Sequence, residues 1–284
     1  MLTEVKLVDG LRELLLAPRP GIALVGLDKG FPAIREDVED AADADGTNDW
    51  TERYGAAAVV LTLRLYQAGG TRKIIDNLGM YCHPARRPYL VVADDEWETP
   101  RRVKLRANQL SWPIESGKGP IREVQATWQA PHGVWETLHP VPVPVGVDIP
   151  SSSGRTYPLV HPRSYAPTNA SGAQPVVNPG NTASHFTARL YGPIVAPRLI
   201  NMLTGQQIVF TSALTLGAGE YVQIDTSVRT AFLLGDPYVG RLGHIDFSIN
   251  SWWQMQPGVQ HIRYTGEDPS PGAVAEITYH PAWL

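Results

Sequence analysis

Carboxylates gather between residues 37 and 52, in a pattern close to that of an EF-hand calcium loop. When Gly46 takes the place of the invariant glycine, four ligand positions of the loop carry an acid: Asp43, Asp45, Asp49 and Glu52. The first ligand position falls on Ala41, which has no carboxylate, and the following residues favour a strand where an EF-hand needs a helix. We therefore expect a solvated acidic loop and no metal site.

Residues that could catalyse a reaction are present but are not arranged in a known motif. The eight histidines show no HExxH or paired-ligand spacing: His83, His132, His139, His161, His185, His244, His261 and His280. Cys82 beside His83 is not a triad signature, because triad partners meet in space and are rarely neighbours in sequence. No GxSxG, GxxxxGK[ST] or GxGxxG motif occurs. A carboxylate pair for glycoside hydrolysis stays open. We expect no enzyme activity and no cofactor.

Basic residues cluster at 86–87 and 101–104, where aromatic residues lie nearby. A nucleic-acid patch is one interpretation. The other is that these are strand-edge arginines, which pair with the acids at 94–98 or protect an edge against aggregation. The net charge of −4 and the pI near 6.1 favour the second interpretation, because binding to phosphates requires a basic excess. No sequence-specific nucleic-acid partner is expected.

The composition favours many short strands. The 26 glycines and 25 prolines indicate frequent turns. Asp9-Gly10 between two apolar segments predicts a hairpin. We expect a short helix at 72–78, and the other predicted elements are all strands: 2–8, 11–17, 21–27, 56–66, 87–92, 103–107, 121–129, 186–190, 245–253, 259–264 and 273–280. The predicted class is all-β with minor helix.

A proline-rich stretch divides the chain. Residues 140–180 contain nine prolines among Ser, Gly and Asn clusters, which is typical of a linker. The expected organisation is an N-terminal domain at 1–140, a linker or arm at 141–180 and a C-terminal domain at 181–284. A single cysteine allows no intrachain disulfide, and we see neither a signal peptide nor a membrane span.

Five short segments with turns between them are expected at 190–234. Gly205 and Gly219 suit turn positions, and Asp225 can close an Asx turn before the next strand. Pro193 and Pro197 should confine the first segment to an edge or a strand end, because proline has no N–H for a ladder. Nothing in this stretch is arranged for chemistry, so we interpret it as scaffold.

The same stretch resembles the C-terminal half of siphophage distal tail proteins, also called minor tail proteins. The pattern is P-x-I/L-x-N, TG-x-x-I-x-F, L-x-x-GE-x-x-x-IDT and R-T-A, carried by Pro197, Asn201, Thr204, Gly205, Ile208, Phe210, Gly219, Glu220, Ile224, Asp225, Thr226 and Arg229. Later residues that fit the same pattern are Trp252, Trp253, Pro257 and Gly258. In the first half of the chain the resemblance is in layout more than in motif.

The resemblance implies a structural virion protein at the tail tip, assembled in the host cytoplasm. It implies an N-terminal β-barrel or sandwich domain that forms a homohexameric ring, and a C-terminal galectin-like β-sandwich outside it. Expected partners are the tail tube protein, the tail-tip or baseplate hub protein and a receptor-binding protein. The motif residues Asn201, Gly205, Gly219, Asp225, Trp252, Trp253, Pro257 and Gly258 are then expected to be structural.

The main alternative is a carbohydrate-binding β-sandwich that acts in host-surface adhesion. Trp252 and Trp253 could stack on a sugar, as aromatic residues do in carbohydrate-binding modules. Adjacent residues of a strand face opposite ways, so at most one of the two can lie on a given sheet face. We therefore expect one of them in the core, and no affinity for simple galactosides.

Overall fold

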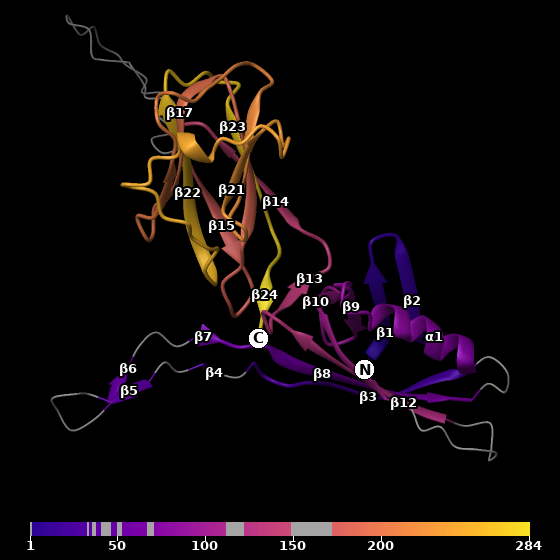
Figure 1. The fold of residues 1–284 in the computed structure, drawn as a ribbon. Coiled ribbons are helices and arrows are strands. Elements are labelled where there is room, and N and C mark those ends of the chain that lie inside the picture. The colour runs from indigo at the N-terminus through magenta and orange to yellow at the C-terminus, as the bar shows by residue number, and fades with distance from the viewer. Residues whose placement is uncertain are drawn as a thin grey trace, which may run out of the picture. The chain divides into compact units, whose positions relative to one another are not determined.

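The structure is a computed structural model that describes residues 2–32, 34–35, 38–40, 47–49, 53–66, 71–111, 122–148 and 172–284 (Figure 1). The chain divides into two compact units. The first consists of residues 1–138 together with 283–284, and the second of residues 139–282. The predicted class, all-β with minor helix, is confirmed.

The first unit contains two larger sheets. One has the order β2-β1-β9-β10-β13-β24, and the other has the order β11-β12-β8-β3. Two short ladders, β4 with β7 and β5 with β6, lie between β3 and β8 in sequence. The elements are β1 (Leu2–Asp9), β2 (Arg12–Ala17), β3 (Ile22–Lys29), β4 (Ile34–Arg35), β5 (Val38–Asp40), β6 (Thr47–Asp49), β7 (Arg53–Tyr54), β8 (Ala57–Leu65), α1 (Thr71–Tyr81), β9 (Tyr89–Asp94), β10 (Arg101–Lys104), β11 (Arg106–Ser111), β12 (Arg122–Ala130), β13 (Trp135–Thr137) and β24 (Ala282–Trp283).

The predicted hairpin at Asp9-Gly10 is confirmed. Asp9 pairs with Arg12, so Gly10 and Leu11 form a two-residue loop, and Gly10 has the φ of +61° that such loops require. The predicted helix is also present, three residues longer at its C-terminal end and one at its N-terminal end.

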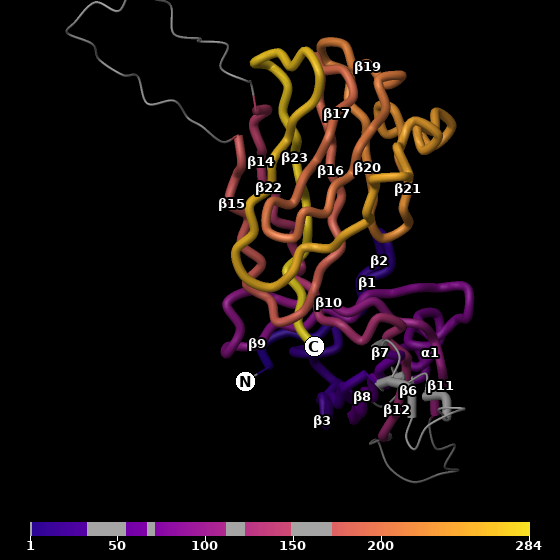
Figure 2. The backbone as a smooth tube through the Cα atoms, turned by 90° about the vertical axis from the view of Figure 1, so that its left-hand side faces the viewer, coloured from indigo at the N-terminus to yellow at the C-terminus, as the bar shows by residue number. Residues whose placement is uncertain are grey.

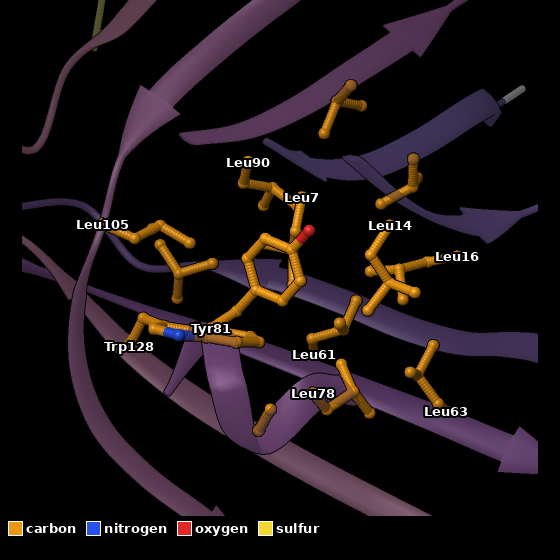
Figure 3. Packing of buried hydrophobic residues seen from close by; sticks show 14 of the residues in the cluster. Leu7, Leu14, Leu16, Leu61, Leu63, Leu78, Tyr81, Leu90, Leu105 and Trp128 are labelled. Carbon is orange, nitrogen blue, oxygen red and sulfur yellow. The ribbon is translucent and has the colours of Figure 1, made fainter. Parts of the chain in front are cut away.

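One core joins both sheets and the helix of the first unit. Every second side chain of β8 is buried, including Leu61, Leu63 and Leu65, as the period of two residues in a strand requires. The helix α1 buries Ile74, Ile75, Leu78 and Tyr81, a spacing that places all four on one face. Figure 3 shows the Tyr81 ring among leucines of β1, β2 and β8, with Trp128 of β12 beside it. The core therefore depends on residues far apart in sequence.

The second unit is a sandwich of two antiparallel sheets (Figure 2). One sheet has the order β14-β23-β16-β20-β21 and the other β15-β22-β17-β18, with β19 also paired to β17. The elements are β14 (Val141–Gly146), β15 (Ala173–Asn178), β16 (Phe186–Tyr191), β17 (Ile194–Asn201), β18 (Gln207–Val209), β19 (Thr215–Leu216), β20 (Tyr221–Asp225), β21 (Thr230–Leu233), the 3₁₀ helix η1 (Leu242–His244), β22 (Gly258–Glu267) and β23 (Val274–Tyr279).

Two stretches of the proline-rich segment are strands of this sandwich. β14, which carries Pro142 and Pro144, is an edge strand of one sheet, and β15, which carries Pro175, is an edge strand of the other. An edge strand tolerates proline because the missing N–H can face outward. Of the expected linker 141–180, residues 149–171 lie outside the described residues.

Cutting the chain within 149–171 should leave the protein in one piece. A specific protease site inserted after Ser152 would separate β14 from β15 along the chain. The ladders of β14 with β23 and of β15 with β22 lie in the same unit and should hold the two fragments together. We expect co-elution in size-exclusion chromatography without denaturant. Separate elution of the fragments would contradict this placement of the two strands.

Pro197 departs from the sequence expectation. It lies in β17, which has β22 on one side and β18 and β19 on the other, so it is not at an edge. The pairing with β22 shifts register between Val195 and Arg198, and Ala196 has a φ of +47°. This β-bulge removes Pro197 from the regular ladder, which is why an inner strand accommodates it.

The strands within 190–234 are divided between the two sheets. β16, β20 and β21 belong to one sheet, whereas β17, β18 and β19 belong to the other. The chain crosses between the sheets after β16 and returns before β20. Turn signals in the sequence mark where strands end but not which sheet the next strand joins.

Candidate assembly surface

Asn201 fastens a turn inside the second unit. Its side chain is fully buried at the end of β17, and its Nδ2 donates to Oε1 of buried Gln260 on β22 at 2.7 Å. Its Oδ1 accepts from the backbone N–H groups of Leu203 at 3.0 Å and Thr204 at 3.4 Å. The Asn201 carbonyl accepts from the N–H of Gly205, which has a φ of +71°. One side chain thus joins two strands and closes the turn to β18.

Gly219 and Asp225 shape the turns on either side of β20. Gly219 has a φ of +81°, a conformation that favours glycine. Oδ1 of Asp225 accepts from the N–H of Ser227 at 2.8 Å and from its hydroxyl at 2.6 Å, which is the predicted Asx turn. Both residues act within the sandwich, in accord with the scaffold interpretation.

The tryptophan pair lies outside any strand. The strand expected at 245–253 is absent, and turns with irregular backbone occupy these residues. Trp253 is only 2% exposed and contacts Phe186 with ring centroids 4.5 Å apart, while Trp252 is half-buried and packs on the same core. Pro257 is exposed, and Gly258, with a φ of +90°, begins β22. The pair therefore offers no open platform for stacking a sugar.

The residues considered for metal binding and nucleophilic chemistry can be examined where the structure describes them. The acidic loop at 41–52 lies largely outside them, and the described part holds no group of three His, Cys, Asp or Glu side chains able to bind a metal. Burial raises the pKa of the Cys82 thiol to about 11, which keeps it protonated and unreactive near neutral pH. Nor is any described helix long and apolar enough to cross a membrane.

A small hollow beside the first hairpin has no room for a substrate. Its volume is about 10 Å³, which a single water would fill, and it is lined by Asp9, Arg12, Met80, Tyr81 and Arg86. Arg86 and Asp9 form an ion pair there.

The strongest candidate surface is the open edge at β2. In the described part of the chain β2 pairs only with β1, so its other side offers backbone groups to a partner. Leu11 at the hairpin tip is fully exposed, and Leu15 on the outer face of β2 is 37% exposed. On the same face Lys6 bonds to Glu13 at 3.3 Å, which adds polar groups around the leucines. Apolar residues with a charged rim are typical of interaction surfaces.

Two other edges of the first unit are less suited to pairing. β3 pairs with β8 through a register shift next to Val25, and such a bulge twists an edge away from a regular ladder. β11 is largely polar and exposed and carries a register shift between Ala107 and Gln109. The edge at β2 thus combines free backbone with exposed apolar side chains. Sequence analysis missed it because edge position depends on long-range pairing.

Two arginines of the basic clusters pair with acids of the first unit. Arg86 pairs with Asp9, and Arg102 pairs with Glu136 at 3.3 Å while it lies over the Tyr89 ring. Each of these two arginines therefore has an acidic partner outside 94–98. The reason is that β10 has β13 beside it, which brings Glu136 close to Arg102.

Solved structures of phage tail proteins share this fold. The crystal structure of the SPP1 Dit (gp 19.1) protein, described as a paradigm of the hub adsorption apparatus in phages infecting Gram-positive hosts, aligns over 99% of both chains with 12% identity and a TM-score of 0.64. A chain of the phage p2 baseplate in its activated conformation with Sr aligns over 98% of this chain and 97% of its own, with 11% identity and a TM-score of 0.55.

The phage p2 baseplate with Ca provides a further similar chain, with 11% identity, a TM-score of 0.53 and coverage of 100% and 99%. No family model matches the sequence, and no curated protein matches it. The shared fold includes both units, since the alignments span nearly whole chains.

Proposed function

We propose that this protein is a structural component at the distal end of a long-tailed phage tail, where it forms a ring that joins the tail tube to the tail tip or baseplate. The observation that carries the proposal is the whole-chain likeness to the SPP1 Dit protein, at a TM-score of 0.64 over 99% of both chains. The motif residues in the second unit support it, because they act as turn and core residues of a sandwich.

The first unit is the ring-forming part in this proposal. The edge strand β2, with exposed Leu11 and Leu15, is prone to pair with another chain. In a closed ring of identical subunits, a neighbouring subunit buries this edge in every copy. The ring has six copies, as the resemblance to distal tail proteins implies. The second unit lies outside the ring. The tail tube protein binds one face of the ring, and the hub protein binds the other face.

Charging the edge at β2 should abolish ring formation. The double variant Leu11→Asp and Leu15→Asp places two carboxylates on the outer surface, where they do not disturb the core. Two interface leucines lost at about 2 kcal/mol each would weaken association by about 1,000-fold. The solution mass from light scattering, with negative-stain imaging, measures the result.

The matched control is Leu203→Asp in the second unit, where the side chain is also exposed. It should leave the ring intact because the proposal assigns association to the first unit. A wild-type protein that stays monomeric at high concentration and in the virion would overturn the proposed ring. A double variant that assembles normally would show that the ring uses another surface.

A further inference from the structure

Three indoles and two cations form a cluster within the first unit. The Arg101 guanidinium on β10 lies 3.9 Å from the ring centroid of Trp283 and 4.5 Å from that of Trp97. Lys29, the last residue of β3, lies over Trp135 with its Nζ 5.5 Å from the ring centroid. Trp97 and Trp135 contact each other with centroids 5.8 Å apart. The two cations thus share one aromatic wall.

Neither cation in this cluster has an acidic partner among the described residues. Three other partly buried arginines do have one. Arg86 pairs with Asp9, Arg102 with Glu136, and Arg263 with Asp148. In addition, Nε of Arg101 is buried and makes no hydrogen bond. Cation–π contacts with the indoles stabilise the charges in part, but they supply no negative charge.

The pKa of Lys29 reflects the lack of an acidic partner. Burial and, to a smaller extent, the positive charge of Arg101 together lower the pKa of its ammonium group to about 8. Burial also lowers the pKa of Arg101, which nevertheless stays charged. Near neutral pH two positive charges are therefore held together in a partly desolvated place. An anion between them would relieve both the repulsion and the desolvation.

We propose that Lys29 and Arg101 form a binding site for a carboxylate group. Both side chains are partly exposed, so a ligand can approach from solvent. A guanidinium fork matches the planar geometry of a carboxylate, and an ammonium beside it adds a point charge. The indoles lower the local dielectric constant, which strengthens the attraction. The site belongs to the first unit alone, so it does not depend on the proposed ring.

Tryptophan fluorescence of the full-length protein can report on this site directly. Sodium acetate is the probe, titrated against sodium chloride at constant ionic strength. We expect a saturable change with a millimolar dissociation constant. Lys29→Met should weaken acetate binding about 10-fold. Lys104→Met, the same change at an exposed lysine on β10, should leave binding unchanged.

A second measurement separates a binding role from a merely structural one. Saturating acetate should raise the pKa of Lys29 towards its ordinary value, measured by NMR of labelled lysine side chains. Lys29→Met should remain folded, because a neutral side chain removes a charge that burial disfavours. No saturable effect beyond the chloride control, or equal acetate binding by Lys29→Met, would overturn the proposal.

The carboxylate could come from two sources, and a third measurement distinguishes them. If it is an acidic group of a second copy of this chain, saturating acetate should compete with it and lower the solution mass measured by light scattering. If the ligand is a free small carboxylate, acetate should bind with no change in mass. The double variant Leu11→Asp and Leu15→Asp, which removes the proposed ring contact at β2, should still bind acetate. The proposed ring and the proposed carboxylate site can therefore be refuted independently.

Discussion

Replacement of Trp128 by alanine lowers the free energy of unfolding of the first unit by about 3–5 kcal/mol. Its side chain is fully buried on β12, where it is among the largest buried groups of the chain, and it lies beside Tyr81 in the core (Figure 3). Removing the indole opens a cavity between the sheet and α1, which rigid strands cannot close. Denaturant unfolding followed by circular dichroism measures the change.

Two further variants make this expectation specific. Trp128→Phe keeps most of the volume and removes an indole N–H that has no hydrogen-bond partner, so it should destabilise much less than alanine. Gln129→Ala changes the next residue of the same strand, which faces outward, and should shift stability by no more than about 0.5 kcal/mol. A loss of similar size at both positions would argue against core packing as the cause.

Asn201→Ala should destabilise the second unit by about 3 kcal/mol. The substitution leaves Oε1 of Gln260 buried without its donor, and it frees the N–H groups of Leu203 and Thr204 that Asn201 caps. An unsatisfied buried group costs more than the bond itself contributes. Thermal unfolding of the variant, with hydrogen exchange to localise the effect, measures the result.

A double variant tests whether the hydrogen bond between Asn201 and Gln260 accounts for the loss of stability. Gln260→Ala combined with Asn201→Ala should cost less than the two single losses added together, because the first change already breaks the shared hydrogen bond. Met202→Ala, next in sequence and exposed, should be close to neutral. Simple additivity of the two losses would show that Asn201 and Gln260 act independently.

Several features could be predicted from the sequence because they depend on neighbouring residues. Asp9-Gly10 predicts a two-residue hairpin, since glycine accepts the positive φ that the loop needs. The alternating leucines of β8 predict a half-buried strand, and Asp225 predicts its own Asx turn. Each of these depends on residues within one strand or turn. The all-β class follows from many such local signals taken together.

The candidate site could not be predicted in this way. Arg101 faces Trp283 although more than half of the chain separates them in sequence, and β2 is an edge only because β1 pairs with β9 on its second side. Sequence periodicity shows which side chains share a face but not which strand lies next to another. The motif residues Asn201 and Trp253 were recognisable, yet their roles required knowing that Gln260 and Phe186 contact them.

Proline shows most clearly where local and tertiary information differ. Each proline lacks an N–H, which can be read from the sequence and prevents it from joining a regular inner ladder. How the chain meets that constraint depends on the pairing of strands in the folded protein. Pro142, Pro144 and Pro175 lie on edge strands, while Pro197 lies at a bulge in an inner one. Both solutions satisfy the same rule, because a missing donor is tolerated wherever no partner strand needs it.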